Sequence, residues 1–175
     1  PLFTKNGYLI DLIVKTAGFG GSREYYKTDL TVQSYLGISE KTVTAMRIQI
    51  GKIWNWNYDD DFSFEKFYLG GSTSMRAWDV LMFQNLNEKT DGGIFRFMTN
   101  IEVRRNIYKM FGVTFFADAG LLTDVMPAAA FSALNWDVGM GLTLNTPLGP
   151  ARLDYAIQLD NINENKVQLG VQYLF

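Results

Sequence analysis

The ten residues from 166 to 175, KVQLGVQYLF, alternate apolar and polar side chains and end on a phenylalanine. Successive side chains of a β-strand point to opposite faces, so this pattern predicts a strand with one apolar and one polar face. The apolar face carries Val167, Leu169, Val171, Tyr173 and Phe175. The polar face carries Gln168, Gly170 and Gln172.

The same alternation recurs upstream in seven further segments, each bounded by Gly, Asn, Asp or Pro residues that are typical of turns. The predicted strands cover residues 7–17, 26–35, 43–54, 95–105, 111–120, 136–145, 152–159 and 166–175. A long irregular segment at 57–93 separates the third strand from the fourth. Strands with apolar outer faces, and with Tyr and Trp near their ends, are typical of transmembrane barrels. The predicted fold is therefore all-β, with residues 1–175 as an eight-stranded segment of an antiparallel transmembrane barrel.

The predicted inward face is heavily charged. It carries Arg96, Glu102, Arg104, Asp118, Arg152 and Asp154. These side chains would make a poor dry core, which argues against a soluble β-sandwich or a lipocalin-like barrel, where the apolar face points inward. Gly139 and Gly141 on the same face leave room for a bulky group.

Composition excludes several classes of protein. No apolar run approaches the ~20 residues that a spanning helix needs. Cysteine and histidine are both absent, which removes disulfides, thiolate metal sites, Ser-His catalysis and the usual zinc ligands. The net charge of -2 comes with no basic stripe that would favour nucleic acid. We therefore expect no enzyme activity, no metal and no cofactor.

Residues 67–78, FYLGGSTSMRAW, resemble the hallmark extracellular loop of the BamA/TamA-like outer-membrane insertase and translocase superfamily. In that family a Gly-Gly segment precedes a Val/Ile-Arg-Gly-aromatic tip that folds into the barrel. Further matches follow in the expected order: FFADAG at 115–120, NTPLGP at 145–150 with LDYA at 153–156, and the terminal Phe175. The matching loop residues are Gly70, Gly71, Met75, Arg76, Ala77 and Trp78.

The resemblance implies a role for three charged residues. In the family, the loop arginine reaches into the lumen and pairs with acidic residues on the strands that follow, and the matching residues here are Arg76, Glu102 and Asp118. A guanidinium binds carboxylates in a bidentate manner, so this contact would hold the loop in place. We call these three residues the arginine lock. The alternative is that Arg76 is an ordinary solvated surface residue.

One residue departs from the family pattern. Ala77 stands where the best-known members have glycine, and alanine is unfavourable at positive φ. Either the turn at this position is less strained than in those members, or this branch uses another conformation.

The family barrel has sixteen strands preceded by periplasmic POTRA repeats, whereas eight strands and no POTRA pattern are visible here. The chain could be the C-terminal half of such a barrel, its remainder could be a separate segment, or eight strands could close alone or pair with a second copy. We favour a fragment of the larger barrel, because the interior of an eight-stranded barrel only just holds side chains.

The implied function is assembly of proteins in the bacterial outer membrane, or their translocation, without covalent chemistry. The terminal strand, with Gly170, Tyr173 and Phe175, would form a weak seam whose free edge pairs with a substrate strand. Gly170 could equally serve only barrel curvature.

Expected partners are outer-membrane lipids, substrate proteins and assembly-complex subunits. The alternatives are a small passive channel or structural barrel, and an outer-membrane enzyme that the lack of histidine disfavours.

Overall fold

The protein is described by a computed structural model that covers residues 5–18, 24–55, 63–84, 89–124, 133–146 and 149–171. Within these residues, eight antiparallel strands form one sheet in the order β1 to β8. The strands are β1 (Gly7–Ala17), β2 (Tyr25–Ser39), β3 (Thr42–Trp54), β4 (Phe95–Tyr108), β5 (Phe111–Thr123), β6 (Asn135–Thr146), β7 (Gly149–Gln158) and β8 (Asn165–Gly170). A short 3-10 helix, η1 (Ser63–Glu65), lies in the long loop.

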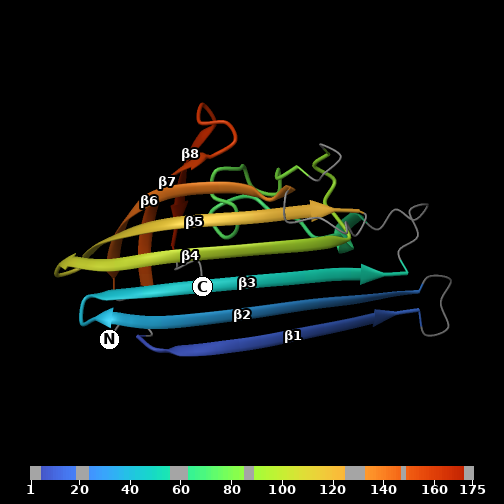
Figure 1. Ribbon diagram of the computed structural model, residues 1–175, viewed down its shortest axis with the longest axis horizontal. Coiled ribbons are helices and arrows are strands. Elements are labelled where there is room, and N and C mark those ends of the chain that lie inside the picture. The colour runs from blue at the N-terminus through green and yellow to red at the C-terminus, as the bar shows by residue number, and fades with distance from the viewer. Residues whose placement is uncertain are drawn as a thin grey trace.

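The sheet is open in the described part of the chain, because β1 and β8 pair only with β2 and β7. Figure 1 shows β1 to β5 side by side along the long axis, while β6 to β8 turn steeply across it. The loop between β3 and β4 lies against the hollow that this curl creates. None of the described helical residues forms a helix long and apolar enough to cross a membrane.

Cross-strand register places the charged residues on one face. Asn100 on β4 lies opposite Asp118 on β5, and Asp118 lies opposite Asp137 on β6. Directly paired residues project to the same side of a sheet. The charged residues Asp118 and Asp137 therefore share one face of the sheet, the inner face, where both are buried.

Several strands run further than the sequence pattern indicated. β2 continues to Ser39 through a register shift at Gly37/Ser39, and β5 continues to Thr123 past Gly120. Gly120 is not a turn residue, because a Cβ there would lie 2.8 Å from the sulfur of Met75. It makes room for the loop. The described part of the last strand is β8, so Tyr173 and Phe175 lie outside the described residues.

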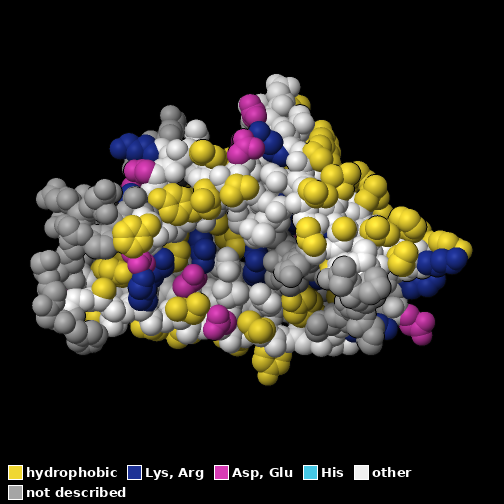
Figure 2. Space-filling view, turned by 180° about the vertical axis from the view of Figure 1, so that it is seen from behind, with side chains coloured by type: hydrophobic (Ala, Val, Ile, Leu, Met, Phe, Trp, Pro, Cys, Tyr) yellow, Lys and Arg dark blue, Asp and Glu magenta, His cyan; other side chains and the backbone are white. Residues whose placement is uncertain are grey.

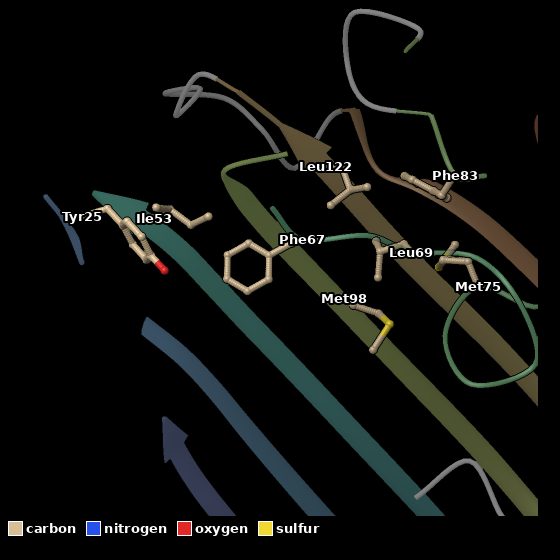
Figure 3. Packing of buried hydrophobic residues seen from close by; sticks show 8 residues of the cluster. All are labelled: Tyr25, Ile53, Phe67, Leu69, Met75, Phe83, Met98 and Leu122. Carbon is tan, nitrogen blue, oxygen red and sulfur yellow. The ribbon is translucent and has the colours of Figure 1, made fainter. Parts of the chain in front are cut away.

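The largest apolar cluster joins the loop to the inner face. Phe67, Leu69, Met75 and Phe83 from the loop pack against strand residues. The strand residues are Tyr25, Ile53, Met98 and Leu122. Figure 3 shows Phe67 with Tyr25 and Ile53 on one side and Leu69 and Met75 on the other. This apolar cluster fixes where the loop enters the hollow.

Candidate functional site

The loop between β3 and β4 makes a tight turn before Arg76. Gly70 and Gly71 have φ values of 109° and 95°, which favour glycine. The Gly70 amide donates to Ser74 Oγ at 2.8 Å, and the Gly71 amide donates to the Met75 carbonyl at 3.1 Å. The turn buries Met75 and projects the next residue, Arg76, toward the inner wall of the sheet.

The Arg76 side chain is completely buried and is bound by two carboxylates. Its Nε donates to Asp118 Oδ2 at 2.8 Å and its Nη2 donates to Asp118 Oδ1 at 2.7 Å. Its Nη1 donates to Glu102 Oε1 at 2.5 Å. The guanidinium carbon also lies 3.4 Å from the ring centroid of Phe116, a cation–π arrangement. The structure thus brings Arg76, Glu102 and Asp118 into one contact.

These partners keep Arg76 charged in spite of its burial. Burial lowers the pKa of Arg76, but the charge and hydrogen bonds of Asp118 and the charges of Glu102 and Asp154 raise it above its ordinary value. Asp154 lies 3.7 Å from Nη1. The fork geometry of arginine suits this site, whereas a lysine ammonium would act as a single point charge.

A second set of contacts holds the backbone just before Arg76. Asn100 on β4 donates through Nδ2 to the Ser74 carbonyl and to Asp118 Oδ1, both at 2.8 Å. Arg47 on β3 donates through Nη2 to Asn100 Oδ1 at 2.8 Å and to the Thr73 carbonyl at 2.7 Å. Asn100 therefore connects the arginine lock to β3.

The backbone after Arg76 is bound by the last three strands. The Ala77 amide donates to Asp137 Oδ2 on β6 at 3.2 Å, and Gln158 on β7 donates through Nε2 to the Ala77 carbonyl at 3.0 Å. Gln168 on β8 donates through Nε2 to the Trp78 carbonyl at 3.2 Å. Lys166 on β8 donates to Asp79 Oδ2 at 2.8 Å. The loop thus connects β3 to β8 across the hollow of the sheet.

Buried charges around the loop tip balance in number. Four buried arginines face four buried carboxylates on or against the inner face: Arg47, Arg76, Arg104 and Arg152 with Glu102, Asp118, Asp137 and Asp154. Glu102 accepts from Arg104 Nε at 2.6 Å, and Arg152 Nη1 lies 3.3 Å from it. Arg152 also donates to Asp154. Arg76, Arg104 and Arg152 offset the burial of Glu102, Asp118 and Asp154 through ion pairs, so removal of one partner would leave a charge uncompensated.

Two inner-face glycines provide the space that this packing needs. A Cβ on Gly139 would lie 2.3 Å from the Phe116 ring, which itself stacks on Arg76. A Cβ on Gly141 would lie 2.0 Å from Asp154 Oδ1. The room that the sequence indicated on β6 is occupied by side chains of β5 and β7.

The loop has a second attachment near its start. Glu65 in η1 accepts from Lys15 on β1, and the Glu65 carbonyl accepts from Lys27 Nζ on β2 at 2.6 Å. Phe67 lies between two cations, with Lys27 Nζ at 4.5 Å and Arg96 Cζ at 4.8 Å from its ring centroid. These contacts connect the loop to β1 and β2.

Sequence reasoning missed part of this site. It placed Arg47, Asn100, Asp137, Gln158 and Gln168 on the inner face but gave them no role at the loop. Their alternation with apolar neighbours indicated which face of the sheet they occupy, but not what they contact. Which loop group each would bind depends on how the strands stagger, and cross-strand register cannot be read from a single strand.

The position of Ala77 resolves the question of its turn. Ala77 is not among the residues with positive φ, whereas Leu81, four residues later, has a φ of 61°. Alanine is therefore accommodated at position 77 without backbone strain. It is completely buried and packs with Phe116 and Ala156.

No cluster of acidic residues in the described part of the chain has the geometry of a metal site.

The chain matches a protein family, a curated protein and solved structures. The model of the Omp85 superfamily domain matches residues 1–174. The outer membrane protein assembly factor BamA of Neorickettsia risticii is 27% identical over 174 residues, which cover 93% of this chain and 23% of that protein. The crystal structure of BamA from Haemophilus ducreyi lacking POTRA domains 1-3 has a TM-score of 0.74 at 14% identity, covering 97% of this chain and 38% of that one. The chain therefore has the fold of part of that barrel and spans about a quarter of the curated relative.

Proposed function

The chain belongs to the Omp85 superfamily, and from this membership we propose that it is the barrel segment of a factor that assembles proteins in the bacterial outer membrane. The family and its BamA relative place it among non-enzymatic outer-membrane barrel proteins. The proposed activity belongs to the whole protein, because the relative that carries the name is about four times as long as the matched segment.

The observation that carries the proposal is the arginine lock. A fully buried guanidinium, bound by Asp118 and Glu102 and stacked on Phe116, holds the loop across the inner face. Together with the Gly-Gly turn and the family match, this arrangement supports a structural role for the loop. The loop would hold β3 to β8 in one geometry, and the edge of β8 would pair with a substrate strand. We propose that this loop lies on the extracellular side, as the family resemblance implies.

The proposed mechanism is pairing at the free edge of β8. In the described residues β8 pairs with β7 over six residue pairs, from Arg152–Gly170 to Ile157–Asn165. An unpaired edge presents backbone donors and acceptors that can bind an incoming strand. Gly170, at the end of the described strand, has no side chain to pack and would weaken the seam. Substrate barrel proteins, secreted proteins and assembly subunits are the proposed partners.

Depletion and complementation test this proposal. The full-length protein is depleted in its own bacterium, and folded outer-membrane proteins are quantified by their resistance to unfolding in SDS. We expect these proteins to fall on depletion, to recover with the wild type, and to recover poorly with Arg76→Ala when membrane levels of the variant match. Unchanged levels of folded outer-membrane proteins after depletion would overturn the proposal.

The passive channel receives less support. A channel needs an open lumen, whereas this loop packs against the inner faces of β3 to β8. Ion conductance of the full-length protein in planar bilayers separates the two functions. Large steady conductance that Arg76→Ala leaves unchanged, combined with unimpaired protein assembly after depletion, would favour the channel.

A further inference from the structure

Arg105 projects from β4 toward the outer, apolar face of the sheet. The even-numbered residues of β4, such as Glu102 and Arg104, are buried on the inner face, while Val103, Arg105 and Ile107 alternate with them and are exposed. In the part of the chain that the structure describes, the Arg105 side chain has no hydrogen bond or ion pair. A cation on an outer face that the membrane would cover calls for a partner.

Arg105 stands at the end of an apolar row that crosses five strands. It lies opposite Val113 on β5, which lies opposite Leu142 on β6. Leu142 lies opposite Leu153, and Leu153 lies opposite Leu169 on β8. Leu142, Leu153 and Leu169 are 63%, 49% and 74% exposed. Within the described residues, the row therefore runs from a guanidinium that has no partner to β8, the last strand of the sheet.

The apolar residues of this row line a groove on the outer face, and Arg105 stands next to Val113 at its end. A cavity of about 340 Å³ is bounded by Val113 and the three leucines of the row, together with Ile107, Phe111, Leu144 and Ala151. A second cavity of about 290 Å³ shares Leu142 and Leu153 and continues toward Met140, Tyr155 and Val167. The two cavities therefore adjoin at Leu142 and Leu153 on the outer face.

Further cations lie at the same rim. Lys109 is in the turn between β4 and β5, and Lys41, whose carbonyl accepts from the Asn106 amide at 2.9 Å, is in the neighbouring turn beside Glu40. Both lysines are exposed. In Figure 2 basic side chains lie at the far right tip, next to a band of hydrophobic side chains, at the end where Figure 1 places the β4–β5 turn. Short turns of membrane barrels face the periplasm.

We propose that this outer groove binds a phospholipid of the periplasmic leaflet with an anionic headgroup. One acyl chain lies along Val113, Leu142 and Leu153, and the phosphate accepts hydrogen bonds from Arg105, with Lys109 close by. Guanidinium groups bind phosphate in a bidentate manner, and basic residues at the membrane surface attract anionic lipids. The inference rests on the placement of the chain in the membrane, not on its assembly activity. The bound lipid would lie beside the edge of β8.

Native mass spectrometry of the full-length protein tests the site. The protein is reconstituted in phosphatidylcholine vesicles that contain phosphatidylglycerol as a minor component, and retained lipids are counted after release. We expect phosphatidylglycerol to be enriched over its share in the vesicle. The double variant Arg105→Gln, Lys109→Gln should lower that enrichment about 25-fold, since each of the two cations near a membrane contributes about fivefold. Arg105→Lys should retain part of it.

Two further variants separate the headgroup from the acyl chain. Ala151→Trp fills the groove and should reduce retention of both lipids. Lys52→Gln is the matched control, because Lys52 lies on the outer face at the opposite end of β3, over the Trp54 ring at 3.6 Å, and carries the same charge. It should leave enrichment unchanged. Each variant must first show wild-type resistance to unfolding in SDS.

The outcomes are distinct. Undiminished enrichment in the double variant, or an equal loss in Lys52→Gln, would overturn the site. Displacement of the retained lipid by excess inorganic phosphate, or an acidic protein retained in its place, would also overturn it. Because the readout is lipid retention, failure here leaves the depletion test of the proposed function unaffected.

Discussion

Arg76 in the loop and Asp118 on β5 are joined by two parallel hydrogen bonds, from Nε to Oδ2 at 2.8 Å and from Nη2 to Oδ1 at 2.7 Å. Both side chains are fully buried. Bidentate pairs of this kind fix orientation as well as distance. The loop backbone on either side of Arg76 is therefore held in one position, and the contacts of Asn100, Asp137 and Gln168 with that backbone depend on it.

Arg76→Lys should keep the positive charge but lose the fork. A lysine can reach one carboxylate at a time, so Asp118 and Glu102 cannot both be satisfied. We expect a loss of about 2 kcal/mol in the free energy of unfolding, with faster protease cleavage of the loop. Urea unfolding and limited proteolysis of the full-length protein measure both. A lysine variant as resistant to protease as the wild type would show that the fork is dispensable.

Asp118 and Asp137 should respond differently to loss of charge. They lie directly opposite each other on β5 and β6, an unfavourable arrangement for like charges. Asp118→Asn removes a charged partner of Arg76, whereas Asp137→Asn keeps an oxygen for the Ala77 amide and takes no hydrogen-bond partner from Arg76. We expect Asp118→Asn to be the more destabilising by about 1–3 kcal/mol. Thermal unfolding of the two variants side by side measures the difference, and the reverse order would contradict this description of the site.

Gly51→Val should displace the first part of the loop. A Cβ on Gly51 would lie 2.5 Å from the Phe67 ring, so the ring must leave its place between Lys27 and Arg96. Overpacking of this kind costs about 1–3 kcal/mol. Gly37→Ala is the control, since the nearest group to its Cβ is the Lys5 carbonyl at 3.2 Å, outside the loop. Tryptic cleavage near Lys66 should accelerate in the first variant only.

The contact of Glu65 should weaken in acid. Burial raises the pKa of Glu65. The hydrogen bonds from Lys15 and Tyr25 and the charges of Lys15 and Lys27 lower it by a larger amount, so the pKa of Glu65 lies below the usual 4.5. A carboxyl with a lowered pKa stabilises the folded state above its unfolded pKa and loses that effect as the pH falls through its folded pKa. The attachment of the loop to β1 should therefore be intact at neutral pH and lost in acid, as the pH falls below 4.5 and through the lowered pKa of folded Glu65.

Glu65→Gln isolates that effect. The variant should show the same loop protection at low and neutral pH, whereas the wild type loses protection on acidification. Protection is measured by hydrogen exchange of residues 64–67, corrected for the intrinsic pH dependence of exchange. Identical pH profiles for the two proteins would assign the acid response to other carboxyl groups.

The sequence predicted the faces of the strands better than their ends. Period-two alternation identifies which side chains share a face, and it placed Glu102 and Asp118 inward without reference to the loop. Strand ends were missed where glycine was taken as a turn signal. Gly120 and Gly37 both lie within strands. Gly120 leaves room for the side chain of Met75, and Gly37 lies at a register shift between β2 and β3.

The partners of the loop backbone could not be predicted in the same way. The contacts of Gln158 and Gln168 with Ala77 and Trp78 join residues about eighty to ninety positions apart. Their meeting depends on the stagger of five strands and on the depth to which the loop enters. The pairing of Arg76 with acidic residues could be predicted only from the family resemblance. The role of Asp137 could not be predicted, because its partner is the backbone amide of Ala77.

A double-mutant cycle on Arg76 and Asp118 tests the arginine lock most directly. Free energies of unfolding are measured for the wild type, Arg76→Ala, Asp118→Ala and the double variant of the full-length protein in one detergent. Each single variant should lose about 3–5 kcal/mol because it leaves a buried charge unpaired. The double variant should lose no more than the worse single variant, which gives a large coupling energy. Additive losses would contradict the account, because they would mean that the two residues stabilise the protein independently.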